Sequence, residues 1–158
     1  MATDRLCVIF KPVNYAIAQW TNYNFNSFCE FNGVQLGSNE DGIYALTGDT
    51  DDGTNIDAFF ELGPTNLGED QQTKLRRLLL SGEFGGNILV TVSRGEGNAI
   101  EYTLSPRSDD MTQTTMETTL QLFHQHHNWS FAIANVDGCD FSIDMIDVLV
   151  ALLARLIR

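Results

Sequence analysis

The sequence contains few cysteines. Only three occur among its 158 residues, Cys7, Cys29 and Cys139, and no two of them form a CxxC pair. An odd number without such a pair fits neither a disulfide framework nor a zinc site. We therefore expect a chain made in a reducing cytoplasm and held together by its apolar core, with no cofactor.

Basic side chains and long apolar runs are also scarce. Nine Lys and Arg stand against 21 Asp and Glu, which gives a formal charge of −12. This balance disfavours binding to nucleic acid and to anionic lipid, because both depend on cationic side chains. No window approaches the roughly 20 apolar residues of a membrane span, and the apolar stretch from Leu6 to Phe10 is too short for a signal peptide. We expect neither membrane insertion nor export by a signal.

Motifs that carry catalysis are absent. The chain has no GxSxG elbow, P-loop, HExxH or dinucleotide fingerprint. Asp140 and Asp144 could form an acid pair, but four residues along a straight strand separate them by about 13 Å, too far for a glycosidase. We therefore predict that the protein is not an enzyme.

Apolar and polar residues alternate with period two through most of the chain. This pattern predicts half-buried antiparallel strands. Near Met145 and Ile146 the apolar phase switches, which indicates a β-bulge or the end of a strand. The alternating segments are Asn55 to Leu62, Ile88 to Ser93, Ala99 to Ser105, Trp129 to Val136 and Phe141 to Met145.

Glycine-containing turns separate these segments. Asn32-Gly33 predicts a tight hairpin, because both residues tolerate positive φ. Arg94 to Asn98 predicts a longer hairpin loop, and Asp137-Gly138 predicts a third hairpin. The pattern of strands and turns is typical of an antiparallel β-sandwich or a jelly roll.

One segment has helical spacing instead. Leu75 and Leu78 begin an apolar stripe, Asn66 is a suitable N-cap, and Gly82 is a suitable C-terminal stop. These features predict about three turns of helix over residues 66–81. The predicted fold class is therefore mainly β, an antiparallel sandwich with one short α-helix.

The C-terminus is a nearly continuous apolar segment. We expect a single sandwich domain over residues 1–147, followed by this segment at 148–158. An exposed tail of this kind would aggregate, so its own domain or a neighbouring subunit must cover it. The residues predicted to lie in a subunit interface are Val148, Leu149, Leu152, Leu153, Leu156 and Ile157.

Two polar segments contain the residue types that bind metal ions. The acidic loop holds the calcium candidates Asp49, Asp51 and Asp52, yet an EF-hand register centred on Gly53 would place Phe59 at the last ligand position. The second segment contains His124, His126 and His127 without a nearby cysteine or carboxylate. We expect solvated turns and no metal at either place.

Aromatic residues gather in the first third of the chain. Flat aromatic side chains beside asparagines are what sugar-binding sandwiches use, and the same density also builds a core or an interface. Trp20, Tyr23 and Trp129 are the candidate sugar-stacking residues.

Two stretches resemble known families. The segment Asp140 to Val148 resembles the last strand of galactose-binding-like jelly rolls and carbohydrate-binding modules. A larger part of the chain is similar to small virion structural proteins of tailed bacteriophages, in which a β-rich domain is repeated around the virion axis, commonly in the tail or baseplate. The residues that carry this second resemblance are Lys74 to Leu78, Gly82-Glu83, Gly86, Ile88 to Val92, Trp129 to Gly138 and Phe141 to Asp147.

The resemblance implies a non-catalytic structural subunit of a bacteriophage virion, assembled in the host cytoplasm. Its partners would be further copies of itself and other virion structural proteins. The alternative is a carbohydrate-binding module that adheres to a glycan of the host surface.

Overall fold

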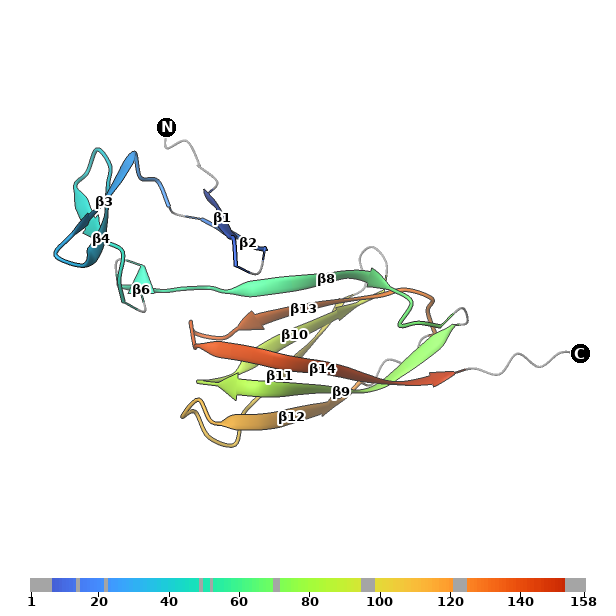
Figure 1. Ribbon diagram of the computed structural model, residues 1–158. Helices are drawn as coiled ribbons and strands as arrows, with labels where there is room; N and C mark the ends of the chain where they lie inside the picture. The colour runs from blue at the N-terminus through green and yellow to red at the C-terminus, as the bar shows by residue number, and fades with distance from the viewer. Residues whose placement is uncertain are drawn as a thin grey trace, which may run out of the picture. The chain divides into compact units, whose positions relative to one another are not determined.

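The computed structural model describes residues 7–13, 15–21, 23–48, 50–51, 53–69, 72–94, 99–120 and 125–152. The chain divides into two compact units, residues 1–49 and residues 50–158. The expectation of one domain over 1–147 did not anticipate this division. Each unit is described by itself below (Figure 1).

The C-terminal unit is an antiparallel β-sandwich, so the predicted mainly-β fold class is confirmed. One sheet consists, in spatial order, of β11 (Ala99–Leu104), β10 (Ile88–Ser93), β13 (Trp129–Asn135) and β8 (Phe59–Thr65). The other consists of β12 (Gln113–Thr119), β9 (Thr73–Phe84) and β14 (Phe141–Leu152). A two-residue ladder between β6 (Thr50–Asp51) and β7 (Thr54–Asn55) precedes them.

The core lies between these two sheets. Alternate residues of the central strands point inward. In β10, Ile88, Val90 and Val92 are therefore buried, whereas the residues between them are only half-buried. Among the described residues, thirteen hydrophobic side chains are buried, all of them in the C-terminal unit: Leu75, Leu78, Leu80, Phe84, Ile88, Val90, Val92, Leu104, Met116, Leu120, Trp129, Phe131 and Ile133.

The predicted helix over 66–81 is wrong, because the chain from Thr73 onward forms β9. Its ladder with β14 skips Arg76, which makes a β-bulge. The bulge inserts one residue into the alternation, so Leu75 and Leu78 are both buried three residues apart, a spacing that mimics a helical stripe. Asn66 caps no helix; its Oδ1 accepts a hydrogen bond from the Gly68 backbone N–H (3.1 Å) in a turn.

A second bulge lies in β14, where the sequence predicts a bulge or a strand end. The register passes from Ile143 to Met145 opposite consecutive residues of β9, which leaves Asp144 as the extra residue. At this point a Cβ on Gly82 would overlap the backbone carbonyl oxygen of Ser142. Gly82 therefore lets the two backbones approach, and the prediction that it ends a helix is wrong.

Two of the three predicted hairpins are confirmed. Asn32 (φ 51°) and Gly33 (φ 78°) join paired strands, and β10 pairs with β11 on either side of residues 94–98. The third is wrong: Asp137 and Gly138 have positive φ, but they connect β13 in one sheet to β14 in the other. An Asp-Gly pair therefore predicts a turn, but it does not predict which sheet the next strand joins.

The N-terminal unit contains two small antiparallel sheets. β1 (Cys7–Lys11) and β2 (Ala16–Trp20) form a hairpin. β3 (Ser27–Phe31), β4 (Val34–Ser38) and β5 (Ile43–Ala45) form a three-stranded meander. No described hydrophobic side chain of this unit is buried.

Candidate functional site

The predicted interface segment continues β14 as far as it is described. Val148 is half-buried and packs against the core, whereas the side chains of Leu149 and Leu152 are 55% and 52% exposed. The remaining predicted interface residues, Leu153, Leu156 and Ile157, lie outside the described residues. The domain itself therefore covers part of this segment, and its role in a subunit interface stays a prediction.

The three predicted sugar-stacking aromatics have different environments. Trp129 is fully buried, and its Nε1–H donates a hydrogen bond to Thr73 Oγ1 (2.9 Å). A ring in this position cannot stack on a sugar at the surface. Trp20 and Tyr23 do meet, with ring centroids 5.2 Å apart and nearly perpendicular planes, so the stacking interpretation retains only these two.

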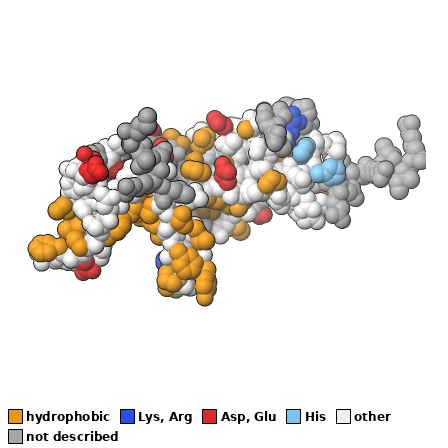
Figure 2. Space-filling view, turned by 90° about the horizontal axis from the view of Figure 1, so that it is seen from above, with side chains coloured by type: hydrophobic (Ala, Val, Ile, Leu, Met, Phe, Trp, Pro, Cys, Tyr) orange, Lys and Arg blue, Asp and Glu red, His pale blue; other side chains and the backbone are white. Residues whose placement is uncertain are grey.

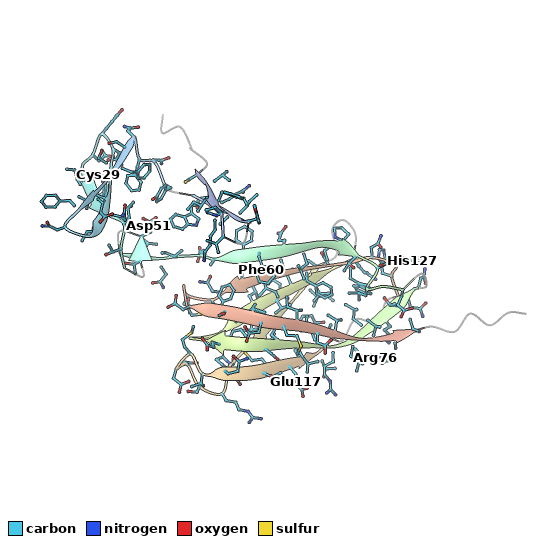
Figure 3. All side chains as sticks on the ribbon, viewed as in Figure 1. Cys29, Asp51, Phe60, Arg76, Glu117 and His127 are labelled. Atoms are coloured by element: carbon cyan, nitrogen blue, oxygen red, sulfur yellow. The ribbon has the colours of Figure 1, made fainter. Side chains whose placement is uncertain are left out.

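Of the three calcium candidates, only Asp51 is among the described residues, and it is exposed on β6 (Figure 3). Asp49 and Asp52 lie outside the described residues. Within the described ranges, no group of three or more His, Cys, Asp or Glu side chains could hold a metal ion.

The described histidines have different environments. His126 forms an isolated bridge with Thr73, whose backbone N–H donates to the His126 carbonyl oxygen (2.9 Å). His126 Nδ1 lies 2.7 Å from the carbonyl oxygen of Asn128. His127 is exposed, and His124 is outside the described residues. His126 thus helps to hold the start of β9 in place.

An aromatic cluster covers one face of the meander in the N-terminal unit. Gly37 lies opposite Phe28 on one side and Tyr44 on the other, which leaves a gap in the side-chain layer of β4. The Phe25 ring fills that gap, because a Cβ on Gly37 would lie 2.8 Å from Phe25 Cγ. Phe25 also contacts Phe28 and Tyr44 (ring centroids 5.9 and 5.6 Å apart).

Tyr23 connects this cluster to the hairpin. Its ring stacks on Phe28 (5.6 Å) and lies nearly perpendicular to Phe25 (4.9 Å), and the Trp20 ring of β2 is also nearly perpendicular to it (5.2 Å). Burial raises the pKa of the Tyr23 hydroxyl above its usual 10.0, and the negative charge of an ionised Cys7 raises the pKa further. One face of each small sheet is thus turned toward shared aromatic packing.

The opposite face of the hairpin is apolar and uncovered. Directly paired residues share a face of an antiparallel ladder, and here Phe10 pairs with Ile17 and Val8 with Gln19. The Tyr15 ring in the connecting turn lies 6.0 Å from the Phe10 ring. We call the surface formed by Val8, Phe10, Ile17 and Gln19 the hairpin face; its three apolar side chains are more than half exposed.

The meander has a second apolar face opposite the aromatic cluster, on which Phe31 and Ile43 are exposed and Val34 and Leu36 are half-buried. Ladder pairs place Cys29 beside Leu36 and Phe31 beside Val34 on this side. Figure 2 shows hydrophobic side chains gathering at the surface of the molecule. We call this surface the meander face, formed by Cys29, Phe31, Val34, Leu36, Ile43 and Ala45.

Sequence reasoning missed both faces. The available signal was that β1 and β2 carry apolar residues at consecutive positions, for example Val8, Ile9 and Phe10. A strand that is apolar on both sides must be covered on both sides. In a five-residue strand this pattern is easily taken for part of an ordinary core.

Comparisons with known proteins give no relative for this arrangement. No protein-family model matches the chain, and no curated protein or solved structure is significantly similar to it. Within the described part of the chain, no helix has the length and hydropathy that a membrane span requires.

Proposed function

We propose that this protein is a non-catalytic structural subunit that acts by packing against other subunits, and that it belongs to a bacteriophage virion, in the tail or baseplate. One observation carries the assembly role. In residues 7–48 no described hydrophobic side chain is buried, while nine large ones are between 48% and 86% exposed: Val8, Phe10, Val13, Tyr15, Ile17, Trp20, Phe28, Phe31 and Ile43.

Exposed apolar surface on this scale favours association. Monomeric soluble proteins seldom expose an apolar patch beyond about 300–600 Å², and a lone two-stranded hairpin is marginally stable in water. A unit of this composition gains stability when neighbouring subunits cover it. The placement in a virion is supported by the sequence resemblance, and the chain offers no catalytic motif that would favour an enzyme.

A second candidate is the carbohydrate-binding module for host-surface adhesion. The half-exposed Trp20 ring beside Tyr23 favours it, because a tryptophan with one free face can stack on a sugar. The burial of Trp129 removes the third predicted contact.

Light scattering and electron microscopy of the full-length chain over a concentration series test the proposal. We expect particles whose mass is a multiple of the chain mass, with a defined shape. A chain that stays monomeric at high concentration contradicts the assembly role. Glycan binding by such a monomer, lost in Trp20→Ala, would favour the second candidate instead.

A further inference from the structure

β14 forms one edge of its sheet. In the part of the chain that the structure describes, β14 has β9 as a neighbour on one side and no strand on the other. The backbone groups on the free side of an edge strand can pair with a strand of another chain. We propose that this edge pairs in antiparallel orientation with β14 of a second copy. The inference rests on the proposed function, because it specifies one contact through which the subunits assemble.

The hydrogen bonds of β9 show which backbone groups of β14 are free. The Leu120 backbone N–H donates to the Arg76 carbonyl oxygen on the β12 side of β9 (2.9 Å). Because backbone groups alternate in direction along a strand, those of Arg77 are directed to the other side, toward its partner Leu149 in β14. The same alternation along β14 directs every second residue away from β9. These residues are Ile146, Val148, Val150 and Leu152.

The start of β9 gives the same result. Thr73 exchanges two backbone hydrogen bonds with His126 (2.9 and 3.2 Å), so its backbone is not directed toward Leu152, its partner in β14. The N–H and C=O of Leu152 therefore lie on the free side, in phase with those of Val150. We call the outward-directed backbone groups from Ile146 to Leu152 the β14 edge.

β14 has the sequence of an interior strand although it lies at an edge. It is apolar without interruption from Val148 to Leu152, as strands with neighbours on every side are. The other three edge strands differ: β8 contains Pro64, which has no N–H to donate, β11 alternates polar and apolar residues, and β12 consists mostly of threonine. Among the edges of the two sheets, the β14 edge is therefore the one suited to a further strand.

The β14 edge is complementary to itself. We consider an antiparallel pairing about a two-fold axis at Leu149. Ile146 then lies opposite Leu152 of the second copy. Val148 lies opposite Val150 of the second copy in the same way. All four outward-directed residues of each strand thus find a backbone partner in the other strand.

The side chains also match in this register. Asp147 lies opposite Ala151 of the second copy and not opposite another carboxylate, which avoids repulsion in a chain with a net charge of −12. Leu149, which is 55% exposed, meets Leu149 of the second copy. The bulge at Asp144 lies before the paired stretch. Because backbone and side chains match through the sequence of β14 itself, we identify the occupant of this edge as a second copy, in a contact that closes with two chains.

Disulfide trapping in the full chain tests the register. The two Leu149 residues would form a non-hydrogen-bonded pair with Cα atoms about 4.5 Å apart, within the range of about 4.4–6.8 Å that a disulfide spans. We expect Leu149→Cys, with the exposed Cys29 changed to serine, to give a covalent dimer under mild oxidation. Thr119→Cys in the same background is the control and should give none, since Thr119 is exposed at the other edge of this sheet.

Charge variants at the same position test the contact without a covalent bond. Leu149→Lys and Leu149→Asp each place like charges opposite one another in a dimer of identical copies. Each variant alone should show a dissociation constant raised about 100-fold or more by light scattering. A mixture of the two places lysine opposite aspartate and should assemble again. Thr119→Lys and Thr119→Asp are the controls and should assemble like the parent chain.

The outcomes separate this contact from the assembly role. An assembling parent chain whose Leu149→Cys variant gives no covalent dimer, or whose two charge variants assemble as it does, would overturn the β14 contact and leave the assembly role intact. A parent chain that stays monomeric would overturn both. Near-UV circular dichroism of the buried Trp129 checks folding. If a charge variant loses that signal, the cysteine variant decides, because it keeps a small apolar side chain at this exposed position.

Discussion

The two units of this chain are built from the same kind of alternating strand, yet among the described residues only the C-terminal unit has buried hydrophobic side chains. In the C-terminal unit, two sheets face each other, and thirteen of the described hydrophobic side chains are buried in the core. In the N-terminal unit, one side of each small sheet packs on a shared aromatic cluster, and no described hydrophobic side chain is buried. Alternation predicts a strand, but a core also requires a second sheet to receive the apolar face.

The two tryptophans provide the largest test of this difference. Trp129 is fully buried in the sandwich, and Trp20 is 48% exposed in the N-terminal unit. We expect Trp129→Ala to lower the free energy of unfolding by about 3–5 kcal/mol, because it leaves a large cavity. Trp20→Ala should cost about 1 kcal/mol or less, since half of its ring already contacts solvent.

Urea unfolding followed by far-UV circular dichroism measures both changes. Trp129→Phe is the control, because it refills most of the cavity and should cost less than Trp129→Ala. Equal costs for Trp20→Ala and Trp129→Ala would contradict the distinction between the two units.

Two glycines test the same comparison with a smaller effect. A Cβ on Gly82 would meet the backbone of β14, and a Cβ on Gly37 would meet only the Phe25 ring. Backbone cannot move aside as a side chain can, so we expect Gly82→Ala to cost about 3 kcal/mol and Gly37→Ala about 1 kcal/mol.

Thermal unfolding measures the two glycine variants. The double variant Phe25→Ala with Gly37→Ala is the control, because removal of the ring also removes the clash. It should be no less stable than Phe25→Ala alone. A larger loss in Gly37→Ala than in Gly82→Ala would mean that the N-terminal unit packs more rigidly than the sandwich.

The strands of the sandwich were predictable where one face is buried and the other is polar. β10 has the predicted bounds, and the phase switch near Met145 is a bulge. The helix prediction failed at Arg76, because a bulge shifts the alternation by one residue and local spacing cannot reveal it. The pairing of β9 with strands on both sides outweighs the helical preference of its leucines.

The candidate surface was less predictable than the fold. The sequence directed attention to the C-terminal segment, and Val148 there packs on its own core. The hairpin and meander faces depend on which residues the ladders place opposite one another, such as Phe10 and Ile17. The sequence does not show this register, because it depends on which residues of two strands pair with each other.

The smallest expected effect is the pH dependence of stability that comes from Tyr23 in the aromatic cluster of the N-terminal unit. Burial raises the pKa of Tyr23, with a further contribution from the charge of Cys7. The folded chain therefore keeps this phenol neutral at a pH where the unfolded chain ionises it. The stability from this group is fully present below about pH 10 and decreases as the pH rises toward the raised pKa.

Absorbance at the wavelength of tyrosinate, compared between the parent chain and Tyr23→Phe, isolates this ionisation. We expect the difference to titrate above pH 10.0, the usual value for the group. Cys7→Ser should reduce the shift only in part, because burial is its larger cause. If Tyr23 titrated at or below its usual value, the aromatic cluster would be open to water, and both sides of the N-terminal sheets would need a partner subunit to cover them.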